Sequence, residues 1–281
     1  MNPNSFSPPS SSSSSNRNSA RTTTRGIFFA IAFSAFAASF FQVAAKADPT
    51  NILSDAEIEG RGLARKILER MAESATDLTN TATLQIHRDH KTMNLFLTVT
   101  TTVKPNNCQV DYEARTNAAS APMERLKIIQ SKEQPGIYYT SQRSPGMIES
   151  GVFDARLLRG NETMIPFAGS DFWLCDFGLE FFRWPAQKVL KKEFHRQCPC
   201  VVLESTNPVP TPGGYSRVVS WIDEESLGIV EACAYDANGK ELKNFYPKDF
   251  QKVNGQYQVQ SLIIVNTQTD SRSRLEFDLK K

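Results

Sequence analysis

Runs in which apolar and polar residues alternate recur along most of this chain, and they restrict it to folds built mainly from β-strands. In the last run, Leu275, Phe277 and Leu279 alternate with charged residues, as in a strand with one buried face. A first strand is expected before residues 87–90, which are interpreted as a solvated turn. The other runs predict strands at residues 93–104, 108–115, 125–130, 137–140, 189–196, 201–205, 215–223, 229–235, 257–266 and 274–280.

Turn signals separate these runs. Asn-Gly pairs at residues 238–239 and 254–255 suit tight hairpins, because both residue types tolerate a positive φ. Many strands joined by short turns indicate an antiparallel meander. A sheet that approaches ten strands is expected to curl into a barrel or partial barrel.

One long helix is predicted near the start of the strand-rich region. Ser54 and Glu57 have the spacing of a capping box, so the helix should begin there. Gly60 and Gly62 weaken its first turns. Apolar residues then recur at helical spacing and form one packing stripe: Ala64, Ile67, Leu68, Met71 and Ala75.

Residues 170–185 break the alternation with an aromatic-rich segment that Pro185 ends. As a helix, the segment places Asp176, Glu180 and Arg183 on one narrow polar stripe, and apolar groups cover the remainder. Such a helix packs as core across an open barrel end or acts as a lid over an apolar cavity, and the two are compatible. The residues predicted to cover and bind a ligand are Phe172, Trp173, Leu174, Phe177, Phe181, Phe182 and Trp184.

The N-terminus has the layout of a signal peptide. A Ser-rich leader and two arginines precede an uncharged run at residues 27–45, and Ala45-Lys46-Ala47 matches a cleavage site. Residues 1–47 are therefore predicted to be a leader cleaved before Asp48, and residues 48–281 an exported single domain. The alternative is a retained membrane anchor, since the run approaches the length that spans a bilayer.

The charge of the chain excludes one class of partner. The leader carries four basic residues and no acidic one, so residues 48–281 hold 28 Lys and Arg against 30 Asp and Glu. A nucleic-acid-binding surface needs a clustered excess of Lys and Arg. No nucleic acid is therefore expected as a partner.

The cysteines are compatible with a disulfide in an exported protein, although their number is odd. All five lie after residue 47: Cys108, Cys175, Cys198, Cys200 and Cys233. The candidate bridge joins Cys198 or Cys200 to Cys233, and buried free thiols are the alternative.

Catalytic and metal-binding signals are weak. His195, Cys198 and Cys200 approach metal-ligand spacing, but a single strand would place His195 on the face opposite the two thiols. The sequence lacks a G-x-S-x-G elbow, a Gly-rich phosphate loop and an H-E-x-x-H motif. We therefore expect no enzyme, no cofactor and no metal.

Three segments carry a family resemblance. Residues 169–172 (Gly-Ser-Asp-Phe), 215–223 (Tyr-Ser-Arg-Val-Val-Ser-Trp-Ile-Asp) and 235–243 (Tyr-Asp-Ala-Asn-Gly-Lys-Glu-Leu-Lys) resemble the outer-membrane lipoprotein-sorting, or LolA-like, family. The resemblance implies an incomplete antiparallel β-barrel of about eleven strands wrapped on the N-terminal helix. It also implies that short helices form a lid over an apolar cavity, and that the protein is periplasmic.

The function that follows is a carrier. The resemblance implies that the protein binds lipoprotein acyl chains or another lipid and delivers them toward the outer membrane. Its partners would be an inner-membrane donor and an outer-membrane acceptor protein. The alternatives are an exported thiol-dependent enzyme and a non-transporting binding or scaffold module on the same barrel.

Overall fold

The computed structural model describes residues 53–131, 134–142, 155–253 and 256–279. The predicted leader and its cleavage site lie outside these residues, as does the predicted turn at residues 254–255. Residues 51–281 form one compact unit.

The N-terminal helix forms where the sequence predicts it. Helix α1 (Asp55–Ser74) begins after Ser54, whose backbone N–H donates to the carboxylate of Glu57 at 2.8 Å. Its buried positions are Gly60, Ala64 and Ile67, which lie on one face at helical spacing. That face packs against strand β7.

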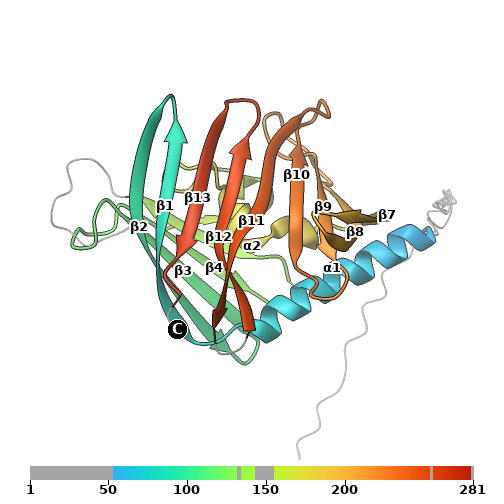
Figure 1. The fold of residues 1–281 in the computed structure, drawn as a ribbon, viewed down its shortest axis with the longest axis horizontal. Helices are drawn as coiled ribbons and strands as arrows, with labels where there is room; N and C mark the ends of the chain where they lie inside the picture. Colours follow the sequence, from blue (N-terminus) through green and yellow to red (C-terminus); the bar gives the residue numbers. More distant parts are fainter. Residues whose placement is uncertain (1–52, 132–133, 143–154, 254–255, 280–281) are drawn as a thin grey trace, which may run out of the picture. The chain divides into compact units, whose positions relative to one another are not determined.

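A single antiparallel sheet makes up most of the fold, in the order β6-β5-β4-β3-β2-β1-β13-β12-β11-β10-β9-β8-β7 among the described residues (Figure 1). Most neighbours in the sheet are consecutive in the chain. The exception is the pair β1 and β13, which brings the first and last strands together in its middle. The strands are β1 (Leu78–Arg88), β2 (Lys91–Lys104), β3 (Asn107–Arg115), β4 (Glu124–Gln130), β5 (Ile137–Gln142), β6 (Arg156–Leu158), β7 (Ala186–His195), β8 (Cys198–Thr206), β9 (Arg217–Asp223), β10 (Ile229–Tyr235), β11 (Glu241–Val253), β12 (Gln256–Asn266) and β13 (Ser271–Phe277).

The described residues hold thirteen strands, so the expected number of about eleven was too low. Strands β6 and β11 were not predicted. The three-residue β6 is too short to show alternation. In β11, the register shifts twice between Pro247 and Phe250, and these irregularities break the period of two. Of the turn predicted at residues 87–90, only Asp89 and His90 form the turn between β1 and β2, both at positive φ, whereas His87 and Arg88 belong to β1.

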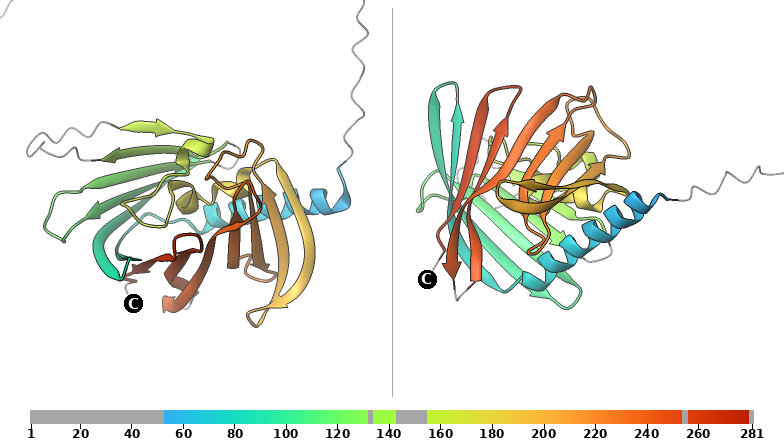
Figure 2. Two further views of the ribbon diagram at one scale, coloured as in Figure 1. Left: turned by 90° about the horizontal axis from the view of Figure 1, so that it is seen from above. Right: turned by 45° about the vertical axis from the view of Figure 1, so that its right-hand side comes forward.

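The sheet is open, because β6 and β7 are its two edges and are not paired with each other. It curves around α1 and the short helices, as the two views of Figure 2 show. The mainly β fold with an incomplete barrel and an N-terminal helix is therefore confirmed. In the described part of the chain, none of the helices has both the length and the apolar character needed to cross a membrane.

Two apolar clusters fill the inner side of the sheet. The first joins β1–β5, with Leu84 and Leu97 fully buried. The second joins α1 to β8–β11 and includes Ile67 and Val218. Phe245 of β11 packs against both clusters. The segment that crosses from one cluster to the other is residues 170–185, called the lid segment below.

Candidate functional site

The lid segment is not one helix, as the sequence pattern suggested. It contains α2 (Leu174–Gly178) and a separate 3₁₀ turn, η2 (Glu180–Arg183). Leu179 separates them with a left-handed conformation, φ 48° and ψ 45°. This conformation ends an α-helix, because the next residues cannot continue its hydrogen-bond ladder. Asp176 and Glu180 are therefore not on one continuous helical stripe.

The start of the lid segment is tied to β13. The backbone N–H of Asp171 donates to Ser273 Oγ at 2.9 Å. Its buried carboxylate accepts hydrogen bonds from Ser271 Oγ at 2.5 Å and Ser273 Oγ at 2.7 Å, and Arg88 Nη2 lies 3.4 Å from it. A buried carboxylate is stable only with such donors. This cluster holds the start of the lid segment on the sheet.

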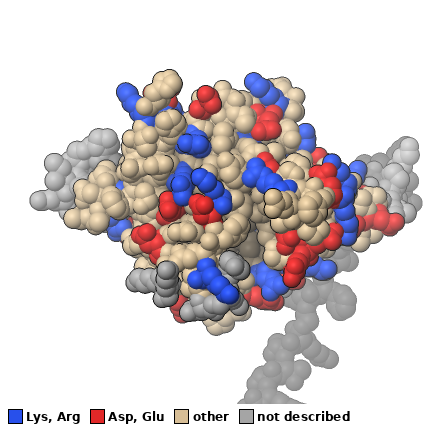
Figure 3. Space-filling view, in the orientation of Figure 1, with Lys and Arg blue, Asp and Glu red and all other residues tan. Residues whose placement is uncertain are grey.

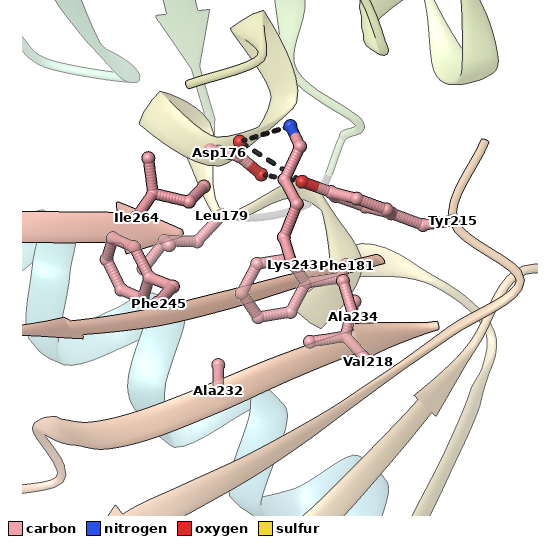
Figure 4. A pocket seen from close by; sticks show the side chains of 10 residues that line it. All are labelled: Asp176, Leu179, Phe181, Tyr215, Val218, Ala232, Ala234, Lys243, Phe245 and Ile264. Carbon is pink, nitrogen blue, oxygen red and sulfur yellow. Dashed lines mark hydrogen bonds and ion pairs between the residues drawn. The ribbon is translucent and has the colours of Figure 1, made fainter. Parts of the chain in front are cut away.

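A second carboxylate of the lid segment meets a buried lysine. Lys243 Nζ lies 3.7 Å from Asp176 Oδ2 and donates to the backbone oxygen of Asp171 at 2.6 Å. Tyr215 donates its hydroxyl proton to Asp176 at 3.0 Å (Figure 4). The ammonium group also lies 3.5 Å from the ring centroid of Trp173, a cation–π contact. Lys243 and Tyr215, which are distant in sequence from the lid segment, thus hold α2 against β11.

Burial shifts both members of this ion pair toward their neutral forms. It lowers the pKa of Lys243 to about 8, although the carboxylates of Asp176 and Asp171 act in the opposite direction. It also raises the pKa of Asp176, against the effect of the Lys243 charge and the hydrogen bonds to the carboxylate. Desolvation is therefore the dominant effect at this contact.

The third carboxylate is Glu180 in η2. Its Oε2 accepts the hydroxyl proton of Tyr138 at 3.0 Å and lies 3.9 Å from Nε of Arg183. Burial raises the pKa of Glu180. The predicted polar stripe of Asp176, Glu180 and Arg183 is thus buried. Groups from the sheet or its loops hold each of these three side chains.

Two cavities adjoin the lid segment. The smaller, about 20 Å³, lies beneath Asp176 and Lys243 and has room for about one water molecule (Figure 4). The larger, about 1120 Å³, lies between the C-terminal half of α1 and β1–β4. Ligand sites in proteins commonly measure about 300–1,000 Å³, so the larger cavity has the volume of a ligand site. Its apolar walls include Leu68, Met71, Val99, Val110, Tyr112 and Phe277.

The predicted lid residues divide between core and cavity. Phe177 lines the large cavity and packs against Tyr112, with ring centroids 4.7 Å apart. Phe181 lines the small one. Trp173 stacks on Tyr215, and Trp184 packs against the second cluster. The remaining three are at most 2% exposed: Phe172, Leu174 and Phe182.

The cysteines are free in the structure, so the candidate bridge from Cys198 or Cys200 to Cys233 is absent. Strand β9 lies between β8 and β10, which separates these thiols by two strand spacings, about 9.6 Å. A disulfide needs Cα atoms less than about 7 Å apart.

The geometry assumed for the histidine and its two neighbouring cysteines was wrong. A hairpin turn separates His195 from Cys198, and the two residues pair directly across β7 and β8, which places them on one face. His195 Nε2 lies 2.6 Å from Glu231, and its ring stacks on Trp221. Within the described residues, no cluster of three or more His, Cys, Asp or Glu side chains has the geometry of a metal site.

The sequence did not reveal the partners of the lid carboxylates. Lys243 and Tyr215 fall in segments that carried the family resemblance, but their side-chain roles could not be assigned. A Lys on the inner face of a strand predicts a buried acidic partner, but only when that strand and its register are known. Strand β11 was not predicted, so this signal was lost.

On the face seen in Figure 3, Lys and Arg lie close to Asp and Glu. Exposed ion pairs include Arg65 with Glu69 and Arg156 with Glu162. Interspersed charges of this kind are typical of a solvated surface.

Comparisons with known proteins identify the fold. A protein-family model described as "Uncharacterized protein" matches residues 155–280. No curated protein matches the chain. A putative outer membrane lipoprotein-sorting protein domain from Vibrio parahaemolyticus is similar in structure, with a TM-score of 0.65 and 15% identity, over 79% of this chain and 92% of that chain.

Two further solved structures agree. A DUF1329 family protein from Desulfovibrio piger has a TM-score of 0.63 and 16% identity, over 80% of this chain and 92% of that chain. A LolA superfamily protein from Nitrosomonas europaea has a TM-score of 0.54 and 16% identity, over 77% and 91% of the two chains. The chain therefore has the LolA-like fold that its sequence resemblance implied, an open antiparallel sheet curved around a helix.

Proposed function

We propose that this protein is a carrier that holds acyl chains of a lipoprotein or another lipid in its large cavity. The observation that carries the proposal is the cavity of about 1120 Å³ with apolar walls on the inner side of the sheet. Burial of each methylene of an acyl chain contributes about 0.8 kcal/mol. A site of this volume and lining is suited to such chains.

In this proposal the lid segment is the movable cover. Phe177 contacts the cargo, since it already lines the cavity. The other six predicted residues, from Phe172 to Trp184, hold the cover on the two apolar clusters when no cargo is bound. The buried carboxylates at positions 171, 176 and 180 fix where the cover rests.

The cellular setting belongs to the same proposal. Residues 1–47 are a cleaved leader, and residues 48–281 act in the periplasm as one half-barrel domain that delivers cargo toward the outer membrane. An inner-membrane donor and an outer-membrane acceptor are its partners. N-terminal sequencing of the protein from periplasmic extract tests this: Asp48 as first residue is expected, and an intact leader in the membrane fraction would overturn it.

A thiol-dependent enzyme is a weaker candidate, because burial makes Cys108, Cys200 and Cys233 poor nucleophiles. Burial raises the pKa of Cys108 and Cys200, and it raises the pKa of Cys233 to about 12. A reactive cysteine needs a lowered pKa to form its thiolate near neutral pH. This favours a role that does not use catalysis.

A pair of adjacent substitutions tests the carrier function. Thr101 of β2 lines the cavity, whereas Thr102 is the next residue and points to the opposite face of the sheet. The experiment titrates a fluorescent fatty-acyl probe into wild type, Thr101→Trp and Thr102→Trp. We expect the Thr101 variant to bind the probe several-fold more weakly and the Thr102 variant to match wild type. Probe binding by none of the three proteins would overturn the proposal.

A further inference from the structure

The large cavity contains a buried cation with an unused hydrogen-bond donor. Arg183 of η2 lines this cavity, and its side chain is only 9% exposed. Its Nη1 donates to the backbone oxygens of Ser131 at 2.9 Å and Gln134 at 3.0 Å. Its Nε is buried and has no hydrogen-bond partner among the described residues. A buried donor without a partner is costly and rare in folded proteins.

The nearest carboxylate does not satisfy this donor. Glu180 Oε2 lies 3.9 Å from Nε, which is beyond hydrogen-bond distance, and it accepts the proton of Tyr138 instead. The other cation on the cavity wall is Lys104, an exposed residue at the end of β2. Among the described residues of the wall, none is Asp or Glu. Asp77 is close by but lies outside the wall, where it accepts the backbone N–H of Val103 at 2.6 Å.

Neutral polar groups surround the same end of the cavity. The wall includes Gln130, Ser131 and Gln134, and also Asn106 in the β2–β3 turn and Asn107 at the start of β3. Cys108 pairs with Gln130 across β3 and β4, so the β2–β3 turn and the end of β4 are adjacent. The cavity therefore has a polar end near Arg183, while its apolar wall includes Val99, Tyr112 and Phe277.

We propose that Arg183 binds the anionic headgroup of an amphiphile, a carboxylate or a phosphate, while the acyl chain lies along the apolar wall. This inference rests on the proposed carrier function and adds the chemical class of its cargo. Because Nε is buried, an oxyanion would reach it only after the guanidinium turns toward the cavity. The oxyanion would then accept from Nε and the adjacent Nη2, the bidentate geometry in which Arg binds carboxylate and phosphate. The side-chain amides of Asn106, Asn107 and Gln134 on the cavity wall would supply additional donors.

The test compares three ligands that share one oleoyl chain: oleate, oleoyl-lysophosphatidate and mono-oleoylglycerol. Each displaces a fluorescent acyl probe from the wild-type protein. We expect one or both anionic ligands to bind on the order of tenfold more tightly than the neutral one, because a charge-assisted hydrogen bond is gained. Preference for oleate alone identifies a carboxylate cargo, and preference for the lysophosphatidate alone identifies a phosphate cargo.

Substitutions test whether the preference for anionic ligands depends on Arg183. Arg183→Met should abolish the preference while binding of mono-oleoylglycerol persists, and Arg183→Lys should retain only part of it. Arg65→Met is the control, because Arg65 is an exposed residue of α1 outside the cavity wall and the change in net charge is the same. Circular dichroism establishes that each variant is folded.

The outcomes separate this inference from the carrier proposal. Equal affinity for the three ligands, or a preference that survives in Arg183→Met, would overturn the assignment to Arg183 and leave the carrier function standing. Failure of all three ligands to displace the probe from wild type would overturn both. If Arg183→Met does not fold, the ligand preference of Arg183→Lys decides, since an unchanged preference there contradicts bidentate binding.

Discussion

Lys243 Nζ lies 3.7 Å from Oδ2 of Asp176, and both side chains are more than nine-tenths buried. A buried ion pair of this kind is a weak source of net stability, because desolvation offsets much of the attraction. Its larger effect is on position, since either charge becomes costly when its partner moves away. This contact therefore fixes α2 over β11.

The first prediction concerns this pair. Lys243→Met should lower the free energy of unfolding by about 3–5 kcal/mol, because it leaves the Asp176 carboxylate buried without its counter-charge. Lys243→Met combined with Asp176→Asn should recover a substantial part of the loss. Urea denaturation measures both values. Arg65→Ala removes an exposed pair with Glu69 and should cost at most about 1 kcal/mol. Additive losses in the double variant would contradict the prediction.

The second prediction concerns Glu124, a buried residue whose carboxylate accepts the backbone N–H of Ala168 at 3.0 Å. Burial raises its pKa from 4.5 to about 7. The folded protein therefore binds more protons than the unfolded chain between these values. The Glu124 contribution to stability is present below about pH 4.5 and is lost as the pH rises to about 7.

Denaturation of wild type and Glu124→Gln across this pH range is the measurement. Wild type should lose stability relative to the Gln variant as the pH rises from about 5 to 7, since the Gln side chain cannot ionise. Glu69→Gln changes an exposed carboxylate and should give a profile parallel to wild type. A constant difference between wild type and Glu124→Gln would show that Glu124 does not titrate in this range.

The third prediction uses two glycines of α1. A Cβ on Gly60 would lie 2.6 Å from the backbone nitrogen of Lys188, whereas a Cβ on Gly62 meets no atom within 4 Å. Gly62→Ala should raise the free energy of unfolding by up to about 1 kcal/mol through helix propensity. Gly60→Ala should lower it by about 1–3 kcal/mol, because α1 must move away from β7. Thermal denaturation distinguishes them, and equal effects would rule out the close approach of α1 to β7.

The fourth prediction separates cover from core in the lid segment. Phe172 is 2% exposed, whereas Phe177 lines the large cavity. Phe172→Ala should cost about 3–5 kcal/mol of stability, as in a packed core. Phe177→Ala should cost less but change the affinity for a fluorescent fatty-acyl probe several-fold. Unchanged probe affinity in Phe177→Ala, together with a large loss of stability, would mean that Phe177 is plain core.

The strands with one apolar face could be predicted from the sequence, because alternation is a local property. Residues 229–235 were predicted as a strand, and β10 has the same bounds. Strand β11 could not be predicted in this way, since Lys243 faces the interior and the register shifts near Pro247. The alternation of apolar and polar residues along a strand does not reveal a buried charge whose partner lies on another helix or strand.

The lid segment shows the same limit. Its apolar character and its position were visible, but the left-handed conformation of Leu179 was not, because a Leu rarely adopts it without tertiary support. Asp176 and Glu180 find their partners at Lys243, Tyr215 and Tyr138, which lie between 39 and 67 positions away. Such pairings depend on sheet register, which hydrophobic periodicity alone does not specify.

The placement of β6 and β7 at opposite edges of the sheet has a mechanical consequence. The chain leaves one edge at Leu158 and must reach the other at Ala186, so the intervening residues span the open side as a tether. A cargo that flattens the sheet would separate these edges and increase the distance that the tether spans. The strain would fall on the contacts of Asp171, Asp176 and Glu180, so a change in the width of the sheet would loosen the hold of the sheet on the lid segment.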